Sequence, residues 1–209
     1  MRVIHLVPSA FDYFEDIRTM AFGIVEELDL AGVDSEIITL QYGTPARSVR
    51  EAAQTQEIKR SYKGIVPTPQ LLDSLLHFDI VHFHVPLLGF LGKFLKWYKQ
   101  HPEVKIVLSY YRPVQNSDVI SWFIAWYNRH YLPLLAHCSQ GLIYFTDNTL
   151  RSITAKMIEG TLMLDATSFM SKSLEEKNQA LSLLNRSELG QNIIALYSEL
   201  LYTTTKSNS

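Results

Sequence analysis

The sequence predicts an α/β fold, with a doubly wound, Rossmann-like parallel sheet in a single domain. Two observations support this prediction. Short apolar segments alternate along the chain with segments whose apolar residues recur at helical spacing. The apolar segments are almost unbroken, as in "IVHFHV" and "KIVLS". Strands of this kind are typical of a parallel sheet that helices cover on both faces.

Six segments are expected to be strands, because each is a short apolar run bounded by turn-forming residues. They are residues 2–7, 35–40, 79–86, 104–109, 141–146 and 160–165. The stretch 41–69 is polar and has no strong period, apart from a short helix expected at 47–60. We expect this stretch to be a mobile insertion.

Seven segments are expected to be helices, because their apolar residues recur at helical spacing. They are residues 13–30, 69–78, 87–100, 117–138, 147–157, 171–184 and 187–202. Asp12 and Glu15 have the spacing of a capping box at the start of the first helix, and Gly32 is a natural stop for it. The segment 117–138 is expected to form one long helix or two helices broken near Pro133.

The domain organisation follows from length and composition. The chain has 209 residues, of which 47% are hydrophobic, and this is enough for one good core. We expect a Rossmann-like domain over 1–165, helices packing on it over 166–202 and a disordered tail over 203–209.

Charge and cysteine content exclude some function classes and indicate a compartment. The net charge of −2 provides no basic field for a nucleic acid, so no nucleic-acid partner is expected. The single cysteine, Cys138, suits a reducing compartment. No signal peptide and no membrane-spanning run is visible. A cytoplasmic location is expected, with peripheral membrane contact as an alternative.

Two histidines on one strand pose the main question of the sequence. His82 and His84 alternate with Val81, Phe83 and Val85, so the two rings share one face of the strand. We expect His84 at the rim of a crevice formed by the carboxyl ends of the strands, and His82 one step deeper. Two alternatives stay open: both rings form hydrogen bonds within the fold, or they make a metal half-site. No nearby Cys, Asp or Glu completes a metal site by sequence, and none is expected.

Several motifs together resemble a known family. "RVIHLVPS", "AGVDSEIITL", "FDIVHFHVP", "VKIVLSYYRP" and "CSQGLIYFTDNTLRSI" occur in the order seen in the amino-terminal domain of family 4-like glycosyltransferases of the GT-B fold. The resemblance covers about residues 1–158, and residues 184–201 resemble the closing helices that pack back on that domain. It implies that the end of the His-x-His strand lines the cleft between two domains, on the acceptor side.

The sequence also departs from that family. The chain has no segment that resembles the donor-binding domain. The glycines expected in the first loop are replaced by "PSAFDYFEDIR", which places acidic residues where a pyrophosphate would lie. The family's "T-x-H-D" becomes "SYYR", with Tyr111 at the position of a histidine and Arg112 at that of an aspartate. A tyrosine is a poor base at neutral pH, whereas an arginine binds phosphates or carboxylates.

The resemblance implies a set of site residues but leaves catalysis open. His84 and Tyr111 are the candidate catalytic residues, although the catalytic group itself stays unknown. The candidate substrate-binding residues are Ser9, Ala10, His82, His84, Ser109, Tyr111, Arg112 and Asn116. No cofactor is expected.

Three functions are consistent with these features. The leading hypothesis is the acceptor-side half of a glycosyltransferase, inactive alone, that acts with a separate donor-binding subunit in glycan or glycolipid synthesis. The second is a non-catalytic partner or regulator of a full-length glycosyltransferase, and the third a stand-alone sugar- or nucleotide-binding domain.

Each of the first two hypotheses requires a surface that binds another protein. Self-association into a homo-oligomer is the alternative to such a partner. The crevice rim and the closing helix around Ile193, Tyr197 and Leu201 are the expected contact surface. The segments 90–99 and 121–135 combine aromatic and basic residues, so they are candidates for peripheral membrane contact. The alternative is that both segments simply cover the sheet.

Overall fold

The computed structural model contains a parallel sheet with helices on both faces, and it describes residues 1–8, 15–41, 60–63, 66–111, 119–145, 162–165 and 186–207. The strands are β1 Arg2–Pro8, β2 Asp34–Gln41, β3 Arg60–Lys63, β4 Ile80–Val85, β5 Lys105–Tyr111, β6 Gly141–Phe145 and β7 Leu162–Asp165. The helices are α1 Glu15–Leu30, α3 Pro69–Ser74, the 3₁₀ helix η2 Leu75–His77, α4 Leu91–Tyr98, α5 Val119–Cys138 and α8 Arg186–Ser207.

All seven strands of the sheet run parallel in the order β3-β2-β1-β4-β5-β6-β7. This confirms the predicted doubly wound α/β class. The chain moves outward from β1 in one direction and from β4 in the other, so the order reverses between these two neighbours. Ligands of doubly wound sheets bind beyond the carboxyl ends of the strands at such a switch point.

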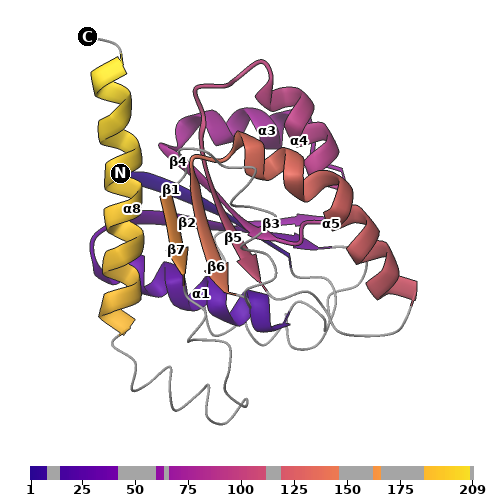
Figure 1. Cartoon of the computed structure of the whole chain (residues 1–209), viewed down its shortest axis with the longest axis horizontal. Helices are drawn as coiled ribbons and strands as arrows, with labels where there is room; N and C mark the ends of the chain where they lie inside the picture. Colours follow the sequence, from indigo (N-terminus) through magenta and orange to yellow (C-terminus); the bar gives the residue numbers. More distant parts are fainter. Residues whose placement is uncertain are drawn as a thin grey trace.

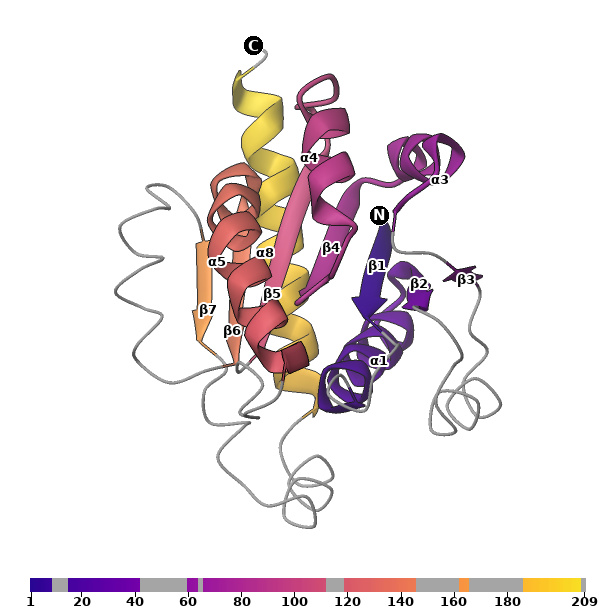
Figure 2. The same ribbon diagram turned by 90° about the vertical axis from the view of Figure 1, so that its right-hand side faces the viewer.

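The helices form a layer on each side of the sheet (Figures 1 and 2). α1 and α8 contact each other on one side, and α8 also contacts β6. α4 and α5 contact each other on the opposite side, where the Trp97 indole of α4 donates a hydrogen bond of 3.3 Å to Asp73 of α3. α4 buries an apolar stripe that includes Phe94, while Lys93 and Lys96 are exposed.

The core lies between the sheet and these two layers. Every side chain of β4 is buried, as expected of a central parallel strand. Phe83 packs edge-on against Phe94 of α4, with ring centroids 4.6 Å apart. On the opposite face, Val7 packs with Ala21, Phe22 and Val25 of α1. Apolar burial of this kind is the main favourable contribution to folding.

α1 ends where its sequence predicts, at Gly32. This glycine has a φ of +81°, a left-handed conformation that costs little only without a Cβ. The Val33 amide donates to the Leu28 carbonyl at 2.9 Å, and the Gly32 amide donates to the Asp29 carbonyl at 3.0 Å. These two bonds are those of a Schellman motif, which satisfies the last carbonyls of the helix.

The structure differs from the sequence predictions in three elements. The expected insertion contains an edge strand, β3, while residues 42–59 lie outside the described residues. α5 is one helix that includes Pro133, which has no N–H to donate to the carbonyl of Arg129, an exposed residue four positions earlier. α8 continues to Ser207, through most of the expected disordered tail.

Four predicted features lie wholly or almost wholly outside the described residues. They are the capping role of Asp12, the short helix expected at 47–60, of which only residue 60 is described, in β3, and the helices expected at 147–157 and 171–184. Within the described residues, no helix combines the length and the apolar character needed to cross a membrane.

Replacing Gly32 by alanine is expected to destabilise the protein by about 1 kcal/mol, because a Cβ is strained at this positive φ. Gly23, in the middle of α1, is the matched control. A methyl group at Gly23 would meet no neighbouring element of the described chain within 4 Å, so Gly23→Ala should stabilise the helix by about 0.5–1 kcal/mol. Urea unfolding of both variants measures the difference, and two changes of the same sign would contradict the assignment of Gly32 as the cap.

Candidate functional site

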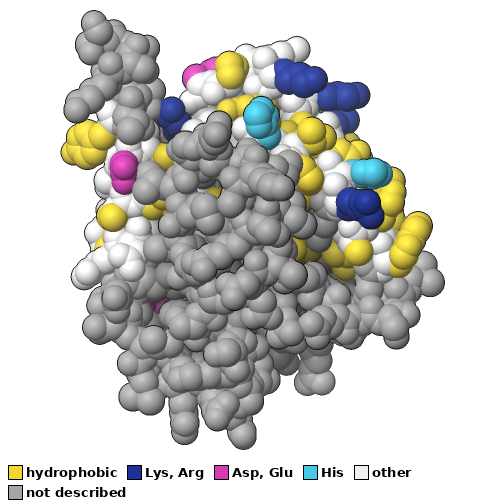
Figure 3. Space-filling view, viewed as in Figure 1, with side chains coloured by type: hydrophobic (Ala, Val, Ile, Leu, Met, Phe, Trp, Pro, Cys, Tyr) yellow, Lys and Arg dark blue, Asp and Glu magenta, His cyan; other side chains and the backbone are white. Residues whose placement is uncertain are grey.

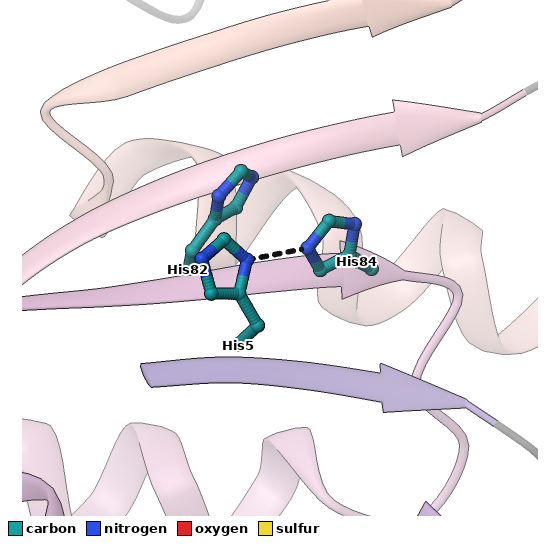
Figure 4. Close-up of side chains that lie close together, drawn as sticks. All are labelled: His5, His82 and His84. Carbon is teal, nitrogen blue, oxygen red and sulfur yellow. Dashed lines mark hydrogen bonds between the residues drawn. The ribbon is translucent and has the colours of Figure 1, made fainter. Parts of the chain in front are cut away.

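Three histidines meet in the interior of the sheet at the switch point between β1 and β4 (Figure 4). The strand register pairs His5 of β1 with His82 of β4, and His84 follows two residues later on the same face. All three rings are completely buried. The ring centroids of His82 and His84 lie 4.4 Å apart in a stacked arrangement, and that of His5 lies 4.8 Å from His82.

His84 links the first strand to the fifth. Its Nε2 atom lies 3.0 Å from Nδ1 of His5, and its Nδ1 atom lies 2.6 Å from the hydroxyl oxygen of Tyr111. The ring of Tyr111 also stacks on that of His84, with centroids 5.8 Å apart. The hydrogen bonds of this one imidazole therefore cross from β1 to β5.

His82 links the sheet to the carboxyl-terminal helix. Its Nδ1 atom lies 2.5 Å from the hydroxyl oxygen of Tyr197 in α8, and its Nε2 atom lies 2.7 Å from the Ser109 hydroxyl in β5. Both partners are buried, so neither bond is exposed to competing water. This arrangement matches the alternative in which His82 forms hydrogen bonds within the fold, under a helix.

The Ser109 and Tyr111 hydroxyls also interact, and this contact joins the two groups into one chain of six side chains. In order, the members are Tyr197, His82, Ser109, Tyr111, His84 and His5. We call this set the histidine chain. A neutral imidazole has one N–H and one acceptor nitrogen, so the protons of the chain can all point in one direction or all in the other.

The histidine chain ends at an unsatisfied atom. Nε2 of His5 has no hydrogen-bond partner among the described residues, although it is buried. Depending on the proton direction, this atom is an unused donor or an unused acceptor. A buried polar atom without a partner costs about 1–3 kcal/mol, and such atoms often mark a function.

Burial keeps the three imidazoles neutral. It lowers the pKa of His5 to about 3. Burial also lowers the pKa of His82 and of His84 well below 6.5, and repulsion from the neighbouring imidazoles lowers them further. Burial raises the pKa of the Tyr111 hydroxyl far above 10, so this tyrosine is not a base at neutral pH. At neutral pH, the chain therefore contains hydrogen-bonding groups without charge.

The structure brings together four of the predicted site residues: His82, His84, Ser109 and Tyr111. His84 was expected at the rim of a crevice but is completely buried. Tyr111 is buried as well, with 1% of its surface exposed. Their roles in substrate binding stay predictions. The other four candidates, Ser9, Ala10, Arg112 and Asn116, lie outside the described residues.

Sequence reasoning did not find His5 and Tyr197. The one signal for His5 was a histidine inside the apolar run of the first strand, and only the register shows that it pairs with His82 of β4. Together the three histidines offer nitrogens within 4.8 Å of one another, so they could hold a metal ion. Tyr197 is separated from His82 by 115 positions, and no local pattern indicates their contact.

The closing helix does not provide the expected contact surface. Ile193 and Tyr197 are completely buried, and Leu201 is half-buried against the core. The reason is that this face of α8 packs on the sheet and on α1. Gly141 of β6 permits the close approach, since a Cβ there would lie only 3.1 Å from the Leu200 side chain.

The two aromatic and basic segments differ in exposure. α4 buries Phe94 and Trp97 against the core, as expected of a helix that covers the sheet. α5 instead exposes Trp122, Phe123 and Trp126, of which Trp122 is 68% exposed. Figure 3 shows hydrophobic, basic and histidine side chains gathered over α4 and α5. A contact of this face with a membrane or a partner stays a prediction.

Comparison of the chain with protein-family models gave no match, and comparison with curated protein sequences gave none either.

The stability of the protein is expected to fall as the pH falls from about 6.5 toward 3. In the unfolded state the histidines titrate near 6.5, whereas His5 in the fold titrates near 3, so the unfolded state binds more protons between these values. Each neutral buried histidine should lower the free energy of unfolding by up to about 1.4 kcal/mol per pH unit in this window. Urea unfolding at a series of pH values, with EDTA present, measures the slope.

Two variants test whether the histidine chain causes this dependence of the free energy of unfolding on pH. His84→Gln should flatten it, whereas His130→Gln, at an exposed position of α5, should leave it unchanged. Equal slopes in the two variants would show that other groups cause the loss of stability in acid.

Removing the hydroxyl of Tyr197 should destabilise the protein by about 1–3 kcal/mol, because Tyr197→Phe leaves Nδ1 of the buried His82 without its partner. Tyr202→Phe is the matched control on the same helix, since Tyr202 is 75% exposed and its change should stay within about 0.5 kcal/mol. Denaturant unfolding of both variants tests this. Indistinguishable midpoints would mean that the hydrogen bond does not hold α8 in place.

Proposed function

We propose that the chain is the acceptor-side domain of a GT-B-like glycosyltransferase, which acts with a separate donor-binding subunit in glycan or glycolipid synthesis. The observation that supports this proposal most is that α8, at the carboxyl-terminal end of the described chain, packs on the Rossmann-like sheet and on α1. This helix packs on α1 and β6 and bonds His82 through Tyr197. The resemblance described above includes closing helices that pack back in this way, whereas a plain Rossmann-like sheet does not require them.

The position of the histidine chain supports the same proposal. His84 is the penultimate residue of β4, which borders the switch point, and Tyr111 is the last residue of the neighbouring strand β5. Because these two rings are buried, they support the carboxyl ends of the strands and do not act as a base. A sugar acceptor would contact the residues that follow β1 and β5 in the sequence, among which are Ser9, Arg112 and Asn116.

One observation favours a second candidate, a non-catalytic partner or regulator of a full-length glycosyltransferase. Burial raises the pKa of Tyr111 and lowers that of His84, so neither candidate residue has a pKa suited to acid–base catalysis near neutral pH. Under this alternative, the same domain contacts a complete transferase and contributes no reacting group.

Affinity purification from the native host, followed by identification of the co-purifying proteins, tests the proposal. We expect a donor-binding subunit, and we expect the reconstituted pair to transfer sugar to an acceptor. The chain alone should show no turnover with common nucleotide-sugar donors, because acidic residues cluster around the start of α1. If the co-purifying protein is a complete transferase, the regulator hypothesis is favoured. If the isolated chain transfers sugar at a higher rate than a Tyr111→Phe control, the prediction that it is inactive without a partner is wrong.

Arg112→Ala should lower kcat/KM of the reconstituted pair by about tenfold or more, because an arginine that binds a phosphate or carboxylate contributes roughly 1.5–3 kcal/mol. Lys93→Ala is the matched control, since Lys93 is an exposed cation on α4. Kinetics of both variants, with circular dichroism to confirm folding, measure the difference. Equal kcat/KM values would remove Arg112 from the site.

A further inference from the structure

We propose that His5, His82 and His84 form a binding site for a zinc-like divalent transition-metal ion, buried at the junction of β1 and β4. This inference does not rest on the proposed glycosyltransferase function. It rests on the convergence of three imidazoles from two neighbouring strands (Figure 4). Three histidines are also the protein ligand set of one class of zinc site.

The separations of the nitrogens suit a single ion. Nδ1 of His5 and Nε2 of His84 lie 3.0 Å apart, so both can lie about 2.1 Å from one zinc ion. The candidate donor atoms of the three residues lie within 4.8 Å of one another, whereas tetrahedral zinc needs about 3.4 Å between nitrogens. Binding would therefore require the His82 ring to move toward the other two and to exchange one of its two hydroxyl partners for the ion. In the metal-free chain, the place of the ion between His5 and His84 is taken by a shared proton.

The second nitrogens of two of the rings already have suitable partners. Nδ1 of His84 contacts the Tyr111 hydroxyl, and His82 contacts the hydroxyls of both Ser109 and Tyr197. When a histidine binds a metal, its other ring nitrogen usually donates to an oxygen of this kind, which fixes the ring and its tautomer. His82 therefore retains an oxygen partner whichever of its nitrogens binds the ion.

The protonation state also suits a metal. Imidazole binds metals only in its neutral form, and burial already keeps all three rings neutral. His5 has a second nitrogen, Nε2, that no hydrogen bond uses among the described residues. A rotation of the ring would turn this nitrogen toward the other two histidines, so either nitrogen of His5 could bind the ion. The ligand set also sets the class of ion. Imidazole favours zinc, copper, nickel or iron over magnesium and calcium, which prefer oxygen ligands.

Complete burial determines how the site would be filled. All three side chains have no exposed surface, so an ion has to enter during folding or through local opening. We therefore expect metal uptake during refolding and slow exchange afterwards. Since the ion would join β1 to β4, it would stabilise the folded chain, as any ligand specific for the folded state does.

The test uses the full chain without a histidine tag, unfolded in denaturant with EDTA and refolded with or without zinc chloride. After desalting over a chelating resin, elemental analysis should find about one zinc ion per chain refolded with zinc, and thermal unfolding should shift to a higher temperature. Magnesium chloride should produce neither effect. His5→Gln and His82→Gln should each lower the retained zinc at least about tenfold, whereas His130→Gln should leave it unchanged.

Cobalt(II) in place of zinc gives a measurement that does not depend on whether the variants fold. The wild-type chain refolded with cobalt should show the intense visible absorption of a tetrahedral ion, and paramagnetically shifted imidazole N–H resonances in its NMR spectrum. Absence of retained zinc in the folded wild-type chain would overturn the proposal. So would equal retention in folded His5→Gln and His130→Gln variants, or the weak absorption of a hydrated octahedral cobalt ion.

Discussion

The packing of the carboxyl-terminal helix depends on one buried imidazole. The His82 ring bonds Tyr197 of α8 on one side and Ser109 of β5 on the other, so a single side chain fastens the helix to two central strands. Buried hydrogen bonds add modest net stability when they are formed, but they are costly to break. Ile193 and Leu196 add apolar contacts of α8 with the core, and the Tyr197–His82 bond is the polar contact beside them.

The same network explains how an otherwise apolar sheet tolerates polar side chains in its interior. His5, His82 and His84 stay neutral, and they share protons with one another and with two tyrosines and a serine. The arrangement crosses the switch point, where a doubly wound sheet binds its ligands. The histidine chain therefore connects the ends of β4 and β5 to β1 and to α8.

Much of the fold could be predicted from local patterns. The apolar runs at 80–85 and 105–111 and the helical stripe around Phe94 each encode one element and its buried face. Gly32 is the natural end of α1 because only a glycine adopts its backbone angle without strain. The predictions of secondary structure were wrong where tertiary contacts or solvent exposure, and not the local pattern, determine the element. β3 is a short polar edge strand, and Pro133 lies inside α5, where the residue four positions earlier, Arg129, is exposed.

For the site, the sequence by itself determined that His82 and His84 share one face of a central strand, since side chains of a strand alternate. It also placed Ser109 at the end of the next strand and Tyr111 just beyond it, whereas the structure extends β5 to Tyr111. Only the tertiary structure decided that His5 completes the cluster, that Tyr197 covers it and that every ring is buried. The physical reason is distance along the chain. Contacts between positions 5 and 84, or 82 and 197, depend on how strands and helices assemble, and no local spacing encodes them.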